Sequence, residues 1–180
     1  MAMSDLSPIS ILRALEARIR SNVVGLPEQE KISETWSGIG FRMGQHYFVA
    51  SMAEVTELLR VPAHTRLPNV KSWVLGVSNI RGRLIPIIDL NSFVGYDSTE
   101  PIRSRRILVI DYQGQPDGLV VDGVEGMQYF VADSFNEAVP ELPDELKPFI
   151  LGHFVKDRKV WSRFSMKTLG DHEQFQEVAV

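Results

Sequence analysis

The stretch Gly76-Val77-Ser78-Asn79-Ile80-Arg81-Gly82-Arg83-Leu84-Ile85-Pro86-Ile87-Ile88-Asp89-Leu90 contains two apolar segments separated by a tight loop around Gly82. Residues 84–90 are typical of a buried strand, and Pro86 within them favours an edge strand or a bulge. Arg81 and Arg83 flank the glycine between the two segments. We expect the Arg81 guanidinium to be partly desolvated there and able to form directed, bidentate hydrogen bonds with a partner.

Short apolar segments recur on both sides of this stretch. Residues 52–60 are predicted to form a brief helical turn or an extended crossover, and a short helix is expected at 166–176. Many short strands joined by Gly-rich turns favour barrels or a sandwich, and the chain lacks the strand–helix alternation that builds a parallel sheet. The other strands are predicted at 39–43, 47–50, 106–112, 119–124, 127–130, 150–155 and 160–164.

The first 35 residues have a different pattern. Four apolar residues recur there at three- and four-residue steps: Ile9, Leu12, Leu15 and Ile19. They predict an amphipathic helix with Ser7 as its N-cap, followed by a polar linker over residues 25–35. The predicted organisation is therefore a helix and linker at 1–35 and a β domain at 36–180. A short helix is marginal in water, so its apolar face should be buried, and we favour burial on its own domain.

The composition of the 180 residues excludes several classes of protein. There is no cysteine, which rules out disulfides and thiolate sites. The net charge of −4 argues against a dedicated nucleic-acid binder. No apolar run approaches the length of a membrane-spanning helix, and charged residues interrupt the leader, so a cytoplasmic protein is expected.

Residue types that carry out catalysis in enzymes are scattered along this chain. The four histidines have no metal-ligand spacing: His46, His64, His153 and His172. Asp89, Asp111 and Asp122 end or interrupt apolar strands, and we favour hydrogen bonds to turn amides over a catalytic pair. Arg103 and Arg105 are interpreted as solvated turn charges. The sequence therefore predicts no catalytic, metal-binding or cofactor-binding residue.

The Gly76–Leu90 stretch resembles the characteristic segment of the CheW-like family, approximately G-V-x-N-L-R-G-x-I-x-P-V-x-D-L. Other family landmarks follow the same order along the chain, over about residues 36–170. They are the hairpin around Phe41 to Phe48, Val55–Leu59, Leu67-Pro68, 106–111 and Gly118–Val124.

The resemblance implies a mainly β fold of two packed five-stranded SH3-like barrels, with a hydrophobic groove between them and no catalysis. In the family this groove receives the cytoplasmic tip of a chemoreceptor, and a barrel end pairs with the regulatory domain of a CheA-type histidine kinase. By residue matching, the receptor-contact positions are Val55, Glu57, Arg81 and Ile107. Two alternatives remain: Val55 and Ile107 as plain core residues, and Arg81 with Glu57 as an internal ion pair.

The helical leader and the segment Trp36-Ser37-Gly38-Ile39-Gly40 depart from the flagellar type. They look like the branch of the family that acts in type IV pilus chemosensory systems and twitching motility. The implied function is a non-enzymatic adaptor between a methyl-accepting receptor and a CheA-type kinase, recruited to membrane-associated arrays without inserting into the membrane. The alternative is a small-barrel nucleic-acid-binding protein.

Overall fold

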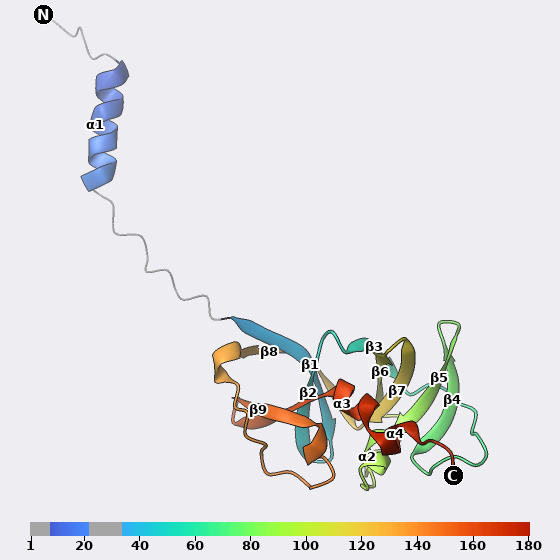
Figure 1. Ribbon diagram of the computed structural model, residues 1–180. Coiled ribbons are helices and arrows are strands. Elements are labelled where there is room, and N and C mark those ends of the chain that lie inside the picture. The colour runs from blue at the N-terminus through green and yellow to red at the C-terminus, as the bar shows by residue number, and fades with distance from the viewer. Residues whose placement is uncertain (1–7, 22–33) are drawn as a thin grey trace, which may run out of the picture. The chain divides into compact units, whose positions relative to one another are not determined.

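The computed structural model describes residues 8–21 and 34–180, and the chain divides into two units, Met1–Ser33 and Glu34–Val180. In the first unit, the described residues form helix α1 (Pro8–Ser21), drawn in blue in Figure 1. Ile9, Leu12 and Leu15 are exposed on it. The predicted Ser7 cap and the linker up to residue 33 lie outside the described residues. Docking of this helix stays a prediction.

Ten strands in the second unit form two five-stranded sheets, which confirms the mainly β prediction (Figure 1). The sheets fit the SH3-like description, although neither hydrogen-bonded ladder closes into a complete barrel. The first lobe has the order β8-β1-β2-β10-β9, with β1 (Thr35–Met43), β2 (His46–Ser51), β8 (Gly123–Val131), β9 (Ile150–Lys156) and β10 (Lys159–Phe164). The second lobe has the order β3-β6-β7-β5-β4, with β3 (Val55–Arg60), β4 (Val74–Ile80), β5 (Arg83–Asp89), β6 (Arg106–Tyr112) and β7 (Gln115–Val121).

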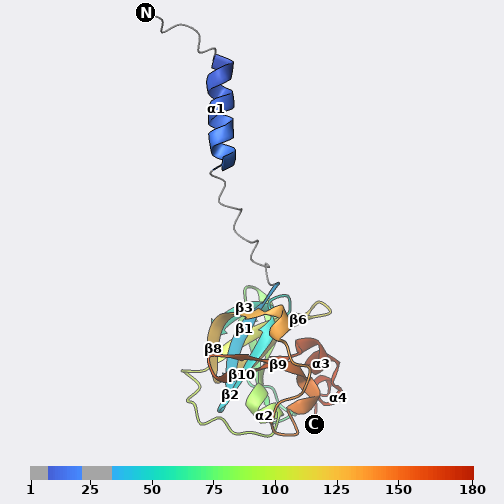
Figure 2. The same ribbon diagram turned by 90° about the vertical axis from the view of Figure 1, so that its left-hand side faces the viewer.

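The two lobes share one strand arrangement but differ in how the chain runs through them. The second lobe is continuous in sequence, from β3 to β7. The first lobe, which faces the viewer in Figure 2, combines β1 and β2 with β8, β9 and β10. If the strands of the first lobe are taken in the order β8, β9, β10, β1, β2, they pair with one another in the same way as β3, β4, β5, β6 and β7 do in the second lobe. Each lobe then contains one parallel pair at the same place, β10 with β2 and β5 with β7. The lobes are circular permutations of each other, although the sequence shows no internal repeat.

A glycine occupies the same place in each lobe, where a loop pairs with an edge strand. Val77 in β4 exchanges two backbone hydrogen bonds with Thr65, and His153 in β9 does so with Asn136, at 2.8–2.9 Å. The preceding residues, Gly76 and Gly152, have φ of 143° and 142°. A Cβ at Gly76 would lie 2.1 Å from the Thr65 carbonyl oxygen, and one at Gly152 would lie 2.4 Å from that of Asn136. Both positions therefore require glycine.

The main hydrophobic core lies between the lobes. Phe41, Phe48 and Phe164 from the first lobe are buried together with Leu108 and Leu119 from the second. A smaller apolar cluster fills the second lobe, and an aromatic cluster fills the first. The short helices are α2 (Leu90–Phe93), α3 (Met166–Asp171) and α4 (Glu173–Gln176), with 3₁₀ turns at Ala132–Ser134 and Lys147–Phe149.

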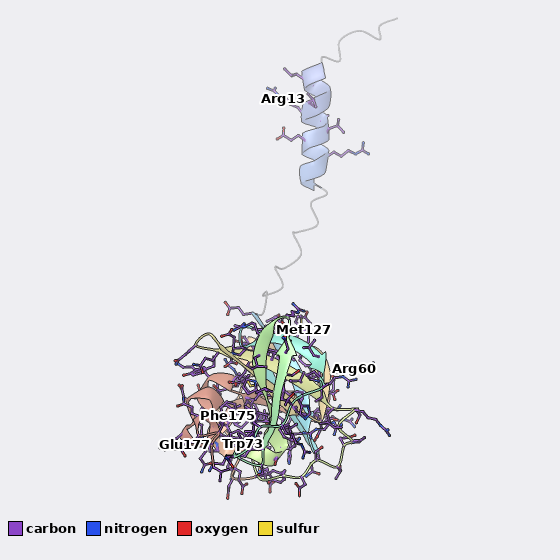
Figure 3. All side chains as sticks on the ribbon, turned by 90° about the vertical axis from the view of Figure 1, so that its right-hand side faces the viewer. Arg13, Arg60, Trp73, Met127, Phe175 and Glu177 are labelled. Atoms are coloured by element: carbon purple, nitrogen blue, oxygen red, sulfur yellow. The ribbon has the colours of Figure 1, made fainter. Side chains whose placement is uncertain are left out.

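The segment after β10 crosses from the first lobe to the second. Phe175 on α4 stacks on Trp73 with ring centroids 6.1 Å apart, and the two residues lie next to each other in Figure 3. Beyond α4, Lys71 N–H donates to the Val178 carbonyl oxygen at 2.9 Å. The C-terminal residues therefore hold the two lobes together.

The structure corrects several predicted elements. Residues 55–60 form strand β3, which settles the choice left open for 52–60. The apolar run 119–124 is not one strand, because β7 ends at Val121 and β8 begins at Gly123. The predicted C-terminal helix is divided at His172, whose backbone is extended with φ −74° and ψ 125°. Strand β5 is not an edge strand, and Pro86 lies just before the stretch that pairs with β7.

Candidate partner-binding site

Arg81 lies in the two-residue turn between β4 and β5. Its φ is 50° and that of Gly82 is 83°, as a type I′ hairpin turn requires. Asn79 Oδ1 accepts a hydrogen bond from the Gly82 N–H at 2.8 Å, which fixes the turn. The Arg81 side chain is 77% exposed, so the expectation of a partly desolvated guanidinium is wrong. A tight hairpin turn projects its side chains outward instead of enclosing them.

Glu57 on edge strand β3 forms an ion pair with Arg81. Arg81 Nε lies 3.1 Å from Glu57 Oε2, an atom that is itself buried. Since β3 and β4 are the two edges of the second-lobe sheet, the pair spans the opening between them. This contact is the internal Arg81–Glu57 ion pair that the sequence analysis gave as an alternative to receptor contact. Because the arginine is largely exposed, the pair contributes no more than about 1 kcal/mol to folding.

Val55 lies at the start of β3, beside a small groove between the lobes. Its side chain is partly buried against the interlobe core, opposite Ile110 on β6. The groove has a volume of about 100 Å³ and is bordered by Glu54, Tyr112 and Lys167, among others. Glu54 holds its two sides together, because its carboxylate accepts from the Ser51 N–H at 3.3 Å and from the Lys167 N–H at 3.1 Å.

Ile107 is not at the surface. It is fully buried in the core of the second lobe, where its side chain packs over Gly118. Its register partner on β3 is Leu59, two residues beyond Glu57. The plain core interpretation therefore holds for Ile107, which supports β3 from beneath. The structure brings Glu57 and Arg81 together and places Val55 farther along the same strand.

Arg105 is a buried residue, so its interpretation as a solvated turn charge is wrong. The residue is 4% exposed. Its Nη1 and Nη2 donate to the Asp89 carboxylate at 2.7 and 2.6 Å, and its Nε lies 3.4 Å from Asp122 Oδ1. Arg103 is exposed, as expected. Sequence spacing gives no signal for this difference, since the two arginines are close neighbours before the same strand.

The strand-end aspartates accept hydrogen bonds, as the sequence analysis favoured. Asp89 caps α2 by accepting from the N–H groups of Asn91 and Ser92. Asp122 accepts from the Gly44 N–H at 2.6 Å, from Asn91 Nδ2 at 3.0 Å and from the Ser98 hydroxyl. Asp111 accepts from the Gly114 N–H at 2.9 Å. These contacts join loops and strands, and each of the three carboxylates accepts at least one backbone hydrogen bond.

Metal binding, membrane spanning and nucleic-acid binding gain little support from the described part of the chain. Residues 8–21 and 34–180 contain no group of histidines and carboxylates placed to hold a metal ion. No helix among them is long and apolar enough to cross a membrane. Lys159 lies over the Tyr47 ring at 4.3 Å and Arg163 over the Trp36 ring at 5.1 Å. The protein's own cations thus cover these rings, which makes them poor platforms for stacking nucleic-acid bases.

Residues 37–174 match the family described as the CheW-like domain, so the chain belongs to the CheW-like family. The protein PilI of Pseudomonas aeruginosa is 46% identical to it over 99% of this chain and all of that protein. That alignment includes the helical leader and confirms the resemblance to the pilus branch. A probable chemotaxis protein CheW of Rhizobium etli is 29% identical over 73% of this chain and 84% of that protein.

A solved structure supports the fold independently. The scaffolding protein TtCheW of Thermoanaerobacter tengcongensis superposes with a TM-score of 0.70 at 23% identity, over 81% of this chain and 98% of that one. FrzA of Myxococcus xanthus, 30% identical over 64% of each chain, is a further relative. The predicted two-lobed CheW-like architecture is therefore confirmed.

Proposed function

We propose that this chain is a non-enzymatic adaptor that couples a methyl-accepting chemoreceptor to a CheA-type histidine kinase in a chemosensory pathway controlling type IV pili and twitching motility. The observation that carries the proposal is the 46% identity to PilI along the whole chain, including the leader. Membership of the CheW-like family and the shared fold support the adaptor role. The protein would act in the cytoplasm, at membrane-associated receptor arrays.

The receptor tip would bind beside β3 in the second lobe. Val55 and the interlobe groove offer apolar surface there, and the Glu57–Arg81 pair offers charged groups at its side. Arg81 is the anchor of the four matched residues, because its guanidinium is the most exposed and can form directed hydrogen bonds. Ile107 would act indirectly, by supporting β3. The kinase regulatory domain would pair with the first lobe near the β1–β2 hairpin.

Binding measurements with the two partners test this proposal. The full chain is titrated by calorimetry with a receptor cytoplasmic tip, with a kinase regulatory domain, and with each in the presence of the other. We expect saturable binding of both and a ternary complex, because an adaptor needs two separate surfaces. Binding of neither partner, or mutually exclusive binding of the two, would contradict the adaptor role.

A further inference from the structure

The Asp117 carboxylate on β7 is unusual among the acidic groups of the second lobe. Side chains alternate along a strand, and Gly118 faces Ile107 and Ile87 inside the lobe. Asp117 therefore faces the opposite side, as Leu119 does in the interlobe core. It is half-buried, and no residue within 8–21 or 34–180 donates a hydrogen bond to it or forms an ion pair with it. Asp89, Asp111 and Asp122 all have such partners.

This carboxylate borders a cavity of about 420 Å³ between β5, the β6–β7 hairpin and the C-terminal helices. Ile88, Phe175 and Val178 provide apolar walls, and Gln115 and Gln176 provide amide groups. Gln176 Nε2 donates to the Gly170 carbonyl oxygen at 2.9 Å, which leaves its amide oxygen as a free acceptor. Among the described residues that line the cavity, Asp117 alone is charged at neutral pH.

The surroundings of Asp117 make its negative charge unfavourable. Burial and, to a lesser extent, the neighbouring Asp111 carboxylate raise the pKa of Asp117 from 3.8 to about 6. At neutral pH the group is still ionised. The neighbouring Asp111 carboxylate is paired with Arg83 Nη1 at 3.6 Å, but no cation within residues 8–21 or 34–180 pairs with Asp117 itself. A cation that enters the cavity would favour the ionised form of Asp117 and offset part of the cost of burying its charge.

We propose that this cavity binds an ammonium or guanidinium group carried on an aliphatic stem, such as a lysine or arginine side chain of a partner protein or a free polyamine. The apolar walls would take the methylene groups, as they do for the stems of basic side chains elsewhere. Asp117 would supply a charge-assisted hydrogen bond and the Gln176 oxygen a second acceptor. Val55, Glu57 and Arg81 do not line this cavity, although Tyr112 borders both it and the interlobe groove, so the cavity is adjacent to the proposed receptor site but distinct from its matched residues.

An NMR titration of the full chain tests the site. The probes are Nα-acetyl-lysine methylamide, Nα-acetyl-arginine methylamide and putrescine, with the neutral Nα-acetyl-norleucine methylamide as a matched control. We expect at least one cationic probe to shift the Asp117 carboxyl and Gln176 amide resonances saturably and to lower the pKa of Asp117, and the norleucine probe to have no effect. Tighter binding of putrescine than of the amino-acid probes would identify a free amine as the ligand, and the reverse order a side chain.

The variant Asp117→Asn provides the decisive control. It is isosteric and removes an uncompensated charge, so it should fold, and it should bind the cation at least about tenfold more weakly. Asp133→Asn, which removes an exposed carboxylate outside the cavity, should bind like the parent protein. Unchanged affinity in Asp117→Asn, equal binding of the norleucine probe, or no saturable shift with any cation would overturn the proposal.

Discussion

The side chain of Arg81 is held at one end by Glu57 and is open to solvent over most of its surface. Replacing it with alanine should therefore leave folding almost unchanged but weaken binding of a receptor tip about 5- to 30-fold, or about 1–2 kcal/mol. Lysine should restore only part of the affinity, because it lacks the planar guanidinium. Calorimetric titration with the tip measures both effects.

Arg60→Ala is the matched control for this variant, since Arg60 is exposed on the same edge strand. It should bind the receptor tip like the parent protein. If Arg81→Ala also binds normally and keeps its melting temperature, Arg81 does not belong to the receptor site.

The buried guanidinium of Arg105 leads to a different expectation. Arg105→Met would leave the Asp89 and Asp122 carboxylates without their cation, at the point where α2 and the loop at Gly44 meet. We expect the free energy of unfolding to fall by about 3–5 kcal/mol, which urea denaturation would measure. Arg103→Ala, at an exposed position, should change it by less than about 0.5 kcal/mol. A loss in Arg105→Met as small as the one expected for Arg103→Ala would show that the buried guanidinium has no structural role.

Asp117 should make stability depend on pH in an uncommon direction. Its pKa in the folded protein, about 6, lies above the ordinary 3.8, so between these values the folded state binds more protons than the unfolded state. Its contribution to stability therefore falls as pH rises through this range. Asp117→Asn should be more stable than the parent protein at pH 7.5, by about 1–2 kcal/mol after solvent screening, and nearly equal to it at about pH 4. A stability difference that does not vary with pH would contradict this prediction.

At the scale of elements, periodicity predicted strands well where polar turns separate them. The boundaries of β6 follow the predicted 106–112, and those of β9 and β10 differ by one residue. The break between β7 and β8 was missed because Asp122 lies within a continuous apolar run, and the contacts that turn the chain there come from Gly44, Asn91 and Ser98. Burial of Arg105 was missed for the same reason, since its two aspartates become neighbours only in the folded protein.

The loop-to-strand pairing at Gly76 gives an element-scale prediction. Gly76→Ala places a Cβ against the Thr65 carbonyl in a backbone conformation that alanine avoids, so we expect a loss of stability of about 2–4 kcal/mol. Gly82→Ala is the control, because Gly82 also has positive φ but has open space around it. It should cost about 1 kcal/mol. Equal losses in thermal unfolding would indicate that backbone conformation alone, and not the close approach, requires Gly76.

At the scale of the whole molecule, the C-terminal segment connects the lobes. Phe175 is 5% exposed within the interlobe core, and its removal should cost about 3–4 kcal/mol. Phe175→Ala should also accelerate hydrogen exchange at the Lys71 amide, whose acceptor Val178 follows closely in the chain. Phe135→Ala, at a partly buried phenylalanine within the first lobe, should leave exchange at Lys71 unchanged. Normal protection of Lys71 in Phe175→Ala would contradict this role.

The interleaved path of the chain also has a consequence for synthesis on the ribosome. The β1–β2 hairpin emerges first, but its partner strands β8 and β10 lie beyond residue 122. The second lobe, from β3 to β7, is complete before those strands exist. At about 5–20 residues per second, the apolar hairpin with Phe41 and Phe48 waits several seconds for its sheet. The middle of the chain should therefore fold first during translation, and the hairpin is the segment most in need of a chaperone.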